Sequence, residues 1–388
     1  MGSEPDAAGQ GSDEPAVTYV QVAVNLPLRR EFTYALPRGV VARPGNRVRV
    51  HFHGRKLGGV VVEVRAHSDL PPHKVKPIES VLDDELVLPP ALLELARRMA
   101  HTYGCSLGEA LDAMLPAVAK RRGQRRIPHL DVAAPRDLAQ QAVLELEDQH
   151  QAQSRVLRTV LEFGGPMPLL DVRRRTRTSD SPWQTLVKHG LLKRVLIAEQ
   201  LEELVPQLDE RAERHVLNEH QQRAVDEVSG FVQRGEHATF LLHGVTGSGK
   251  TEVYLRVLEE VRALGKSAIV LVPEISLTPQ TVGRFASRFP DVAVLHSGLT
   301  DAERGRQWQR LLQGKARVAV GARSALFAPV QDLGLIVVDE EHETSFKQDS
   351  TPRYHAREMA IVRGAIERAV VVLGSATPTL ESIGKARR

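Results

Sequence analysis

The chain has 388 residues, too many for one ordinary hydrophobic core, and this length predicts two to four domains. Its composition, 42% hydrophobic and 26% charged, is that of a soluble globular protein, with no apolar run long enough to cross a bilayer. The 52 Lys and Arg residues barely exceed the 48 Asp and Glu residues, so net charge alone does not indicate nucleic-acid binding. The single cysteine, Cys105, excludes a disulfide framework or a multi-cysteine zinc site within this sequence, and we expect it to be buried in a helix. We expect a cytoplasmic protein.

The first third of the sequence predicts a small β-rich domain. Residues 1–16 are acidic and lack the apolar core of a signal peptide, so they predict a disordered tail. Residues 17–64 alternate in a β pattern interrupted by Pro and Gly turns. From Pro89 the period becomes helical, with Leu92, Leu95, Ala96 and Met99 on one face. We therefore predict a small domain, either β-barrel-like or a sandwich, that is closed by helices over residues 17–116.

The middle third predicts a linker and a small helical domain. Residues 117–135 are rich in Arg, Pro and Ala, which is typical of a linker. Within residues 136–207, a helical stretch at 141–163, a second one ending at Gly190 and an apolar run at 191–197 follow the order of a winged helix. A generic helical spacer is the alternative. Basic clusters at residues 120–126 and 173–177 are either solvated loops or phosphate contacts.

The last region, residues 208–388, has the pattern of a nucleotide-binding α/β lobe. Short, fully apolar runs alternate with amphipathic helices, which predicts a parallel sheet covered by helices on both faces. The predicted strands are residues 239–243, 268–272, 292–295, 318–320, 335–338 and 370–373.

A phosphate loop follows the first of these strands. Residues 244–251 read GVTGSGKT, which matches G-x-x-x-x-G-K-[ST] and precedes a predicted helix. Glycines let backbone N–H groups surround phosphates, and the helix N-terminus adds a positive dipole. Lys250 is expected to contact the β- and γ-phosphates of ATP, and Thr251 to offer its hydroxyl to Mg²⁺. The expected ATP contacts are Gly244, Val245, Thr246, Gly247, Ser248, Gly249, Lys250 and Thr251.

An acidic box, residues 339–342 (DEEH), follows the predicted strand 335–338. The carboxyl ends of strands are where ligands bind in open α/β sheets. We expect Asp339 to hold Mg²⁺ and Glu340 to orient and deprotonate the attacking water, which makes Lys250, Asp339 and Glu340 the candidate catalytic residues.

These strings resemble superfamily 2 helicases, and within them the primosomal replication-restart helicases of the PriA family. Leu217 and Asn218 with Gln221 resemble the adenine-sensing element, which implies that Gln221 binds ATP. Residues 271–278 (LVPEISLT) are similar to motif Ia, and residues 321–327 (GARSALF) resemble the family's GTRSALF. Residues 374–378 (GSATP) match motif III.

The same resemblance implies DNA contacts in two places. In the family, the stretch after the acidic box is an aromatic-rich loop that couples DNA contact to ATP hydrolysis. With the GARSALF element it implies DNA contacts by Arg323, Ser324, Phe346, Lys347, Arg353, Tyr354 and His355. The N-terminal domain resembles the family's 3′-end-binding domain, with Phe32, Thr33 and Tyr34 at the DNA. Thr33 replaces an acidic residue and is a weaker acceptor for a terminal hydroxyl, so general DNA contact is implied more firmly than 3′-end recognition.

The resemblance implies an ATP-dependent 3′-5′ DNA helicase that remodels stalled or abandoned forks and starts primosome assembly. Its partners would be forked and single-stranded DNA, single-strand-binding protein and helicase-loading proteins, in the nucleoid and not at a membrane. The sequence ends after motif III, so we expect the second helicase lobe and its zinc module to be absent, and little ATP hydrolysis by this chain alone. The alternative is a DNA-binding restart scaffold that does not translocate.

Overall fold

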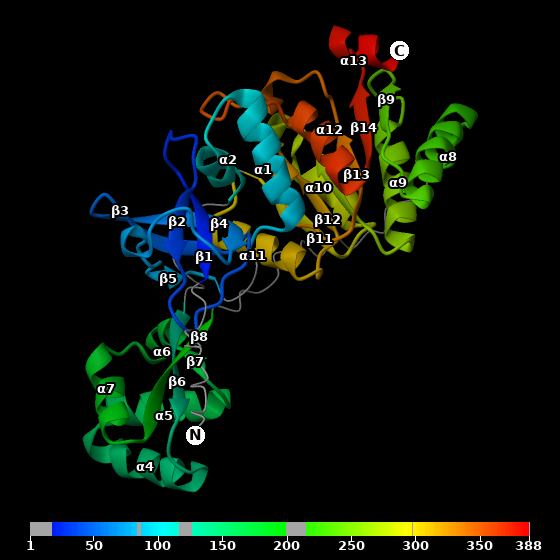
Figure 1. The fold of residues 1–388 in the computed structure, drawn as a ribbon. Helices are drawn as coiled ribbons and strands as arrows, with labels where there is room; N and C mark the ends of the chain where they lie inside the picture. The colour runs from blue at the N-terminus through cyan, green and yellow to red at the C-terminus, as the bar shows by residue number, and fades with distance from the viewer. Residues whose placement is uncertain (1–17, 84–86, 116–125, 199–214, 297, 388) are drawn as a thin grey trace, which may run out of the picture. The chain divides into compact units, whose positions relative to one another are not determined.

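The computed structural model describes residues 18–83, 87–115, 126–198, 215–296 and 298–387. The chain divides into two compact units, Met1–Arg121 with Val205–Arg388, and Arg122–Leu204 (Figure 1). The expected tail at residues 1–16 lies outside the described residues. Within these ranges, no helix combines the length and apolar character that crossing a membrane requires.

The N-terminal region is a curved antiparallel sheet with strand order β2-β1-β4-β3-β5. The strands are β1 (Tyr19–Val24), β2 (Phe32–Ala35), β3 (Arg47–Phe52), β4 (Arg55–Arg65) and β5 (Ser80–Val81), with a short 3-10 helix η1 (Pro72–Lys74) before β5. The edge strand β2 meets the segment before β5, because Ala35 donates to Lys76 O over 3.0 Å and accepts from Ile78 N over 3.0 Å. These bonds bring the two edges together, and the predicted barrel-like sheet is confirmed.

Two helices follow this sheet: α2 packs on β1 and β4, and α1 packs against α2 and against α12 (Ala356–Glu367). Helix α1 (Pro90–Tyr103) begins after Pro89 and ends at Gly104, whose φ of 66° is left-handed. The predicted apolar face of Leu92, Leu95, Ala96 and Met99 is fully buried. Helix α2 (Leu107–Met114) is opened by a capping box between Ser106 and Glu109. Cys105 is buried as expected. It lies in the turn between the two helices and not within one, because Gly104 caps the end of α1 and Ser106 caps the start of α2.

The second unit has a three-stranded antiparallel sheet, β7-β6-β8, packed against helices. Its elements are β6 (Arg126–Val132), α4 (Arg136–Gln149), α5 (Gln151–Phe163), β7 (Met167–Pro168), α6 (Leu169–Thr176), α7 (Asp180–Lys188) and β8 (Leu192–Ala198). The order from α5 to β8 is that of a winged helix. Two expectations are corrected. Part of the predicted linker is strand β6, which forms an antiparallel pair with β8, a strand distant in the sequence. The predicted helical stretch 141–163 is interrupted at His150, whose φ of −138° is not helical.

The third region is a six-stranded parallel sheet between two layers of helices, a RecA-like helicase lobe (Figure 1). The strand order is β11-β12-β10-β13-β14-β9. The strands are β9 (Thr239–His243), β10 (Ser267–Leu271), β11 (Val292–Leu295), β12 (Val318–Gly321), β13 (Leu333–Val338) and β14 (Val370–Ser375). The α-helices are α8 (Glu219–Arg234), α9 (Lys250–Ala263), α10 (Pro279–Ala286), α11 (Asp301–Leu312), α12 (Ala356–Glu367) and α13 (Leu380–Ala386), and the 3-10 helices are η2 (Glu274–Ser276), η3 (Arg323–Phe327) and η4 (Thr344–Phe346).

Alternation along the central strands separates the two hydrophobic layers. In β10, Ala268 and Val270 face the core that α8, α9 and α10 cover, whereas Ile269 and Leu271 face the core of α11 and α12. All five residues of β10 are buried, as expected for a parallel strand that is covered on both faces. All six predicted strands are present.

Candidate nucleotide site and DNA-contact loops

The sheet order brings the phosphate loop, the acidic box and motif III to one edge. Strand β14 lies between β9, which leads into the phosphate loop, and β13, which leads into the acidic box. Ser375 at the end of β14 pairs with His243, and its carbonyl accepts a hydrogen bond from Gly244 N over 3.1 Å. Three segments that are up to 130 residues apart in sequence order thus meet at the carboxyl ends of adjacent parallel strands.

Lys250 connects the phosphate loop to the acidic box. Its Nζ donates to the carbonyl oxygens of Gly244 over 2.7 Å and of Val245 over 3.4 Å. The same Nζ lies 3.7 Å from Oε1 of Glu340. A phosphate group would offer this ammonium stronger, charged acceptors than two carbonyls. Thr246 and Gly247, at the tip of the loop, are exposed, so the loop backbone is accessible to a ligand.

Gln221 supports the phosphate loop from helix α8. Its Oε1 accepts from Asn218 N over 2.9 Å, completing the capping box of α8, and its Nε2 donates to Ser248 O over 2.9 Å. Gly249 adopts a left-handed φ of 83°, and a Cβ there would lie 2.3 Å from Gln221 Nε2. Both amide atoms of Gln221 are therefore engaged within the protein, and contact with adenine stays a prediction.

Asp339 is held at the end of β13 by a buried tyrosine. Tyr254 of α9 donates from Oη to Asp339 Oδ1 over 3.0 Å. Burial raises the pKa of Asp339 above its ordinary value, and the hydrogen bond from Tyr254 opposes that rise. Burial, together with the neighbouring carboxylate, also raises the pKa of Tyr254 well above its ordinary value, so its hydroxyl remains a donor.

Glu340 has a left-handed backbone, with a φ of 48°. This conformation is uncommon for a residue other than glycine and costs of order 1–3 kcal/mol. Two backbone hydrogen bonds of 2.9 Å maintain this conformation. One runs from Glu341 N to Gly374 O and the other from Glu343 N to Glu340 O. The geometry directs Glu340 toward Lys250 while Glu341 enters the interior.

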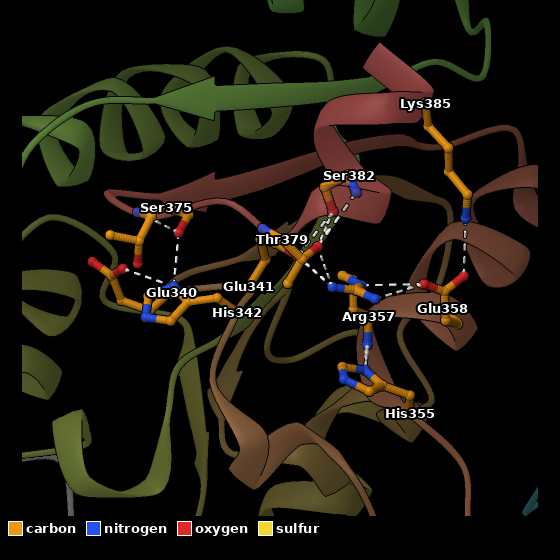
Figure 2. A network of polar contacts seen from close by, with 11 residues as sticks. Glu340, Glu341, His342, His355, Arg357, Glu358, Ser375, Thr379, Ser382 and Lys385 are labelled. Atoms are coloured by element: carbon orange, nitrogen blue, oxygen red, sulfur yellow. Dashed lines mark hydrogen bonds and ion pairs between the residues drawn. The ribbon is translucent and has the colours of Figure 1, made fainter. Parts of the chain in front are cut away.

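The other two residues of the acidic box contact motif III and the segment after it (Figure 2). His342 Nδ1 is 2.7 Å from Ser375 Oγ and 3.6 Å from Glu340 Oε2. Glu341 is fully buried and accepts from Thr379 N over 2.8 Å and from Arg357 Nη1 over 2.7 Å. Burial raises the pKa of Glu341, but the bonds from Thr379 and Arg357 outweigh it and hold the pKa below its ordinary value. The acidic box is thereby connected to the start of α12 and to the turn before α13.

The donor atoms at this edge fit a magnesium ion bound with a nucleotide. Thr251 supplies a hydroxyl at the start of α9, and Asp339 supplies a carboxylate from β13, and hard oxygen donors are those that Mg²⁺ prefers. Within the described ranges, no group of three or more His, Cys, Asp or Glu side chains is arranged to hold a metal ion. A site with so few protein donors is completed by phosphates and water, which is the usual mode for Mg²⁺.

Two aromatic residues that the sequence assigned to DNA stacking lie in the core. Phe346 is 1% exposed and Tyr354 is 2% exposed, and the ring of Tyr354 packs edge-on against Phe327 at 5.2 Å. Burial raises the pKa of Tyr354 to about 12. In this structure neither ring is available to stack on a base, because each fills the core between the loop and α12. The two aromatic rings, which the sequence suggested for stacking on bases, pack in the hydrophobic core instead.

The polar residues of the same loop are more accessible. Lys347 and Arg353 are exposed, and His355 is half-buried at the N-cap of α12. Lys347 Nζ lies 5.3 Å from the ring centroid of Tyr103, whose Oη accepts from His355 N over 3.1 Å. DNA contact by the cationic residues remains a prediction.

Arg323 supports this loop from η3. Its Nη1 donates to Ser345 O over 3.3 Å and to Lys347 O, and its guanidinium lies 5.9 Å from the ring centroid of Tyr354. Ser324, next to it, is exposed. DNA contact by Ser324 stays a prediction, and Arg323 has a clear structural role.

The three residues assigned to DNA in the N-terminal sheet lie on β2. Phe32 is partly exposed, stacks edge-on with Phe52 at 4.7 Å and has the Arg30 guanidinium 5.2 Å from its centroid. Thr33 Oγ1 accepts from Gln21 Nε2 over 2.9 Å. Tyr34 lies on the same face of β2 as Phe32, in the hydrophobic core, and is 4% exposed, so direct contact with DNA does not fit its position. Thr33 lies on the opposite face, so the three residues cannot form one contact surface.

Sequence reasoning missed Tyr254, Glu341, Arg357 and Thr379 as parts of the site. For Tyr254 a signal existed, because it lies four residues after Lys250 and therefore one helical turn further on the same face. For Arg357 and Thr379 no local pattern was available, since their partner Glu341 lies 16 and 38 residues away.

Comparisons with known proteins agree with these features. Residues 21–116 match the family model of the PriA 3′DNA-binding domain, and residues 218–386 match that of the DEAD/DEAH box helicase. The replication restart protein PriA of Chlamydia pneumoniae is 38% identical over 374 residues, covering 95% of this chain and 49% of the relative. That of Bacillus subtilis is 35% identical over 442 aligned residues, covering 96% and 55%.

Among solved structures, RecG bound to a three-way DNA junction matches with 25% identity and a TM-score of 0.34, over 44% of this chain and 22% of that one. The chain spans about half the length of the curated relatives that it matches. Over nearly its whole length the chain is thus similar to the replication restart protein PriA, with one segment that matches the PriA 3′DNA-binding domain and a second that matches the DEAD/DEAH box helicase.

Proposed function

We propose that this chain supplies the Mg²⁺–ATP site and DNA contacts of a 3′-5′ helicase that recognises and remodels stalled or abandoned forks and starts primosome assembly. The observation that carries the proposal is the approach of Lys250 Nζ to within 3.7 Å of Glu340 Oε1. This contact brings the cation of the phosphate loop to the candidate base of the acidic box. The two groups need this proximity, because one binds the phosphate whose bond to oxygen breaks and the other orients the attacking water.

Within this site each residue has a separate task. Lys250 and the backbone of residues 244–249 bind the phosphates. Thr251 and Asp339 hold Mg²⁺, which when bound neutralises charge on the β- and γ-phosphates. Glu340 orients water and accepts its proton, for which a free carboxylate is required.

DNA binding is assigned to exposed polar groups and one partly exposed ring. In the lobe these are Ser324, Lys347 and Arg353, and in the N-terminal sheet they are Phe32 with the adjacent Arg30. Cations on exposed loops contact phosphates, and an accessible aromatic ring stacks on a base of a single strand.

The test separates nucleotide binding from DNA binding. Lys250→Ala is expected to weaken Mg²⁺–ATP binding at least about 30-fold, because loss of a charge-paired contact costs about 2–5 kcal/mol. Binding of a fluorescent forked DNA, measured by anisotropy, should change less than about twofold, because Lys250 is not among the residues assigned to DNA. Lys315→Ala, an exposed lysine outside the site, is the matched control and should alter neither.

Two outcomes would contradict the proposal. Unchanged nucleotide affinity in Lys250→Ala would remove the phosphate loop from the site. Equal loss of fork binding would show that the nucleotide and DNA regions are not separate. Polarity is tested with partial duplexes in the presence of ATP, and displacement from a 5′ tail in place of a 3′ tail would refute the assigned direction.

We also infer partners of two kinds, single-strand-binding protein and helicase-loading proteins, at forks in the nucleoid. The support is the relationship to replication restart proteins. Titration of the purified chain with labelled single-strand-binding protein tests the first, and absence of binding at micromolar concentration contradicts it.

A further inference from the structure

Tyr254 lies where helix α9 of the phosphate loop passes beneath the acidic box. It is 1% exposed and belongs to the hydrophobic core between α9 and the sheet. Its Oη nevertheless leaves that core and donates to Asp339 Oδ1 over 3.0 Å. The tyrosine thus restrains one oxygen of the carboxylate.

The space for this hydroxyl depends on Gly374 of β14. A Cβ at Gly374 would lie 1.6 Å from Tyr254 Oη and 3.4 Å from Asp339 Oδ1. The φ of Gly374 is not left-handed, so the backbone conformation does not require glycine at this position. Glycine is therefore required at this position for steric reasons, because the hydroxyl of Tyr254 occupies the space that a side chain would fill.

The contact joins the two candidate magnesium ligands through rigid elements. Thr251 and Tyr254 both lie on α9, three residues apart, and Tyr254 is hydrogen-bonded to Asp339 at the end of β13. A restraint of this kind limits both the rotation of the carboxylate and its distance from the start of α9. A phenylalanine would fill the same core volume without either effect.

We propose that Tyr254 is a positioning residue of the Mg²⁺–ATP site, which orients Asp339 and sets its spacing from Thr251. The proposal rests on the proposed function, since it assumes that Asp339 and Thr251 hold the metal. Groups that hydrogen-bond to metal ligands fix their orientation, and their loss typically lowers metal affinity by 10–100-fold.

The experiment compares the chain with its Tyr254→Phe variant. Binding of a fluorescent ATP analogue is measured at a series of Mg²⁺ concentrations, and again in EDTA. The variant is expected to need about 10- to 100-fold more Mg²⁺ for half-maximal binding. Its affinity for the nucleotide in EDTA should be unchanged, because the phosphate loop is intact. Tyr19→Phe, which makes the same change at a buried tyrosine of β1, is the control and should need as much Mg²⁺ as the original chain.

The possible failures are distinguishable. If the original chain binds no nucleotide with or without Mg²⁺, the proposed function fails and this inference fails with it. If it binds nucleotide and Tyr254→Phe has the same Mg²⁺ requirement, only the positioning role is refuted. An equal loss of affinity in Mg²⁺ and in EDTA shows a general structural role and also refutes it.

Discussion

Arg357 and Glu341 form a buried ion pair, with 2.7 Å between Nη1 and Oε2 (Figure 2). Glu341 is 0% exposed and Arg357 is 8% exposed. The carboxylate also accepts from Ser382 Oγ over 3.0 Å and from Thr379 N over 2.8 Å. The pair therefore holds the acidic box, the start of α12 and the start of α13 in one arrangement.

Arg357→Met should destabilise the helicase lobe by about 3–5 kcal/mol, because a buried carboxylate would lose its counter-charge. The chain has two tryptophans, and a Trp183→Phe background leaves Trp308, buried in the lobe, as the reporter of its unfolding in urea. Adding Glu341→Met should restore part of the loss, since no unpaired charge remains. Arg353→Met, an exposed neighbour, is the control. A double variant less stable than Arg357→Met alone would contradict this account.

Although Tyr354 and Arg353 are adjacent, we expect substitution of Tyr354 to lower stability and substitution of Arg353 to weaken DNA binding. Tyr354→Ala should lower the free energy of unfolding by about 3–5 kcal/mol, as the removal of a buried aromatic ring does. Arg353→Ala should leave stability within about 0.5 kcal/mol. In a single-stranded DNA binding assay, Arg353→Ala should reduce the slope of log affinity against log salt concentration by the amount that about one phosphate contact contributes. Unchanged DNA affinity and salt slope in Arg353→Ala would remove this residue from the DNA surface.

Cys105 should react slowly in the folded chain. Burial raises the pKa of its thiol, so at pH 8 less of it is thiolate than in an unfolded chain, and access is restricted. We expect modification by Ellman's reagent to be slower by on the order of 100-fold than in guanidinium, which an opening free energy of about 2.8 kcal/mol produces. The modification rate should still increase with pH above the ordinary pKa of a thiol, because the pKa of Cys105 is raised. A rate within threefold of the unfolded value would show that this turn is open.

Gly108→Ala should loosen helix α2 from β1. A Cβ at Gly108 would lie 1.7 Å from the carbonyl oxygen of Val24, a backbone atom that cannot rotate away. Overpacking of this kind costs typically about 1–3 kcal/mol. The reactivity of Cys105, which immediately precedes the N-cap residue of α2, measures the effect and should rise. Gly58→Ala is the control, because nothing lies within 4 Å of its added Cβ. Equal reactivity in the two variants would contradict the tight contact.

The strands of the lobe and its phosphate loop could be read from the sequence because their signals are local. A fully apolar run such as residues 370–373 (VVVL) is typical of a strand buried on both faces, and the glycine-rich loop that includes Lys250 is recognisable from eight consecutive residues. The same reasoning found the buried face of α1, whose residues recur with the helical period.

Only the tertiary structure decided which side chains meet. Tyr254 reaches Asp339 across 85 residues, because α9 passes below the end of β13 and Gly374 leaves room between them. It also placed Phe346 and Tyr354 in the core, although an aromatic residue near a cation looks the same in a sequence whether it packs or stacks on a base. The sequence by itself determined the elements and the chemistry available at each loop, since these depend on neighbours along the chain. The partners of Asp339 and Glu341 depend on the order of strands in the sheet, which no local pattern encodes.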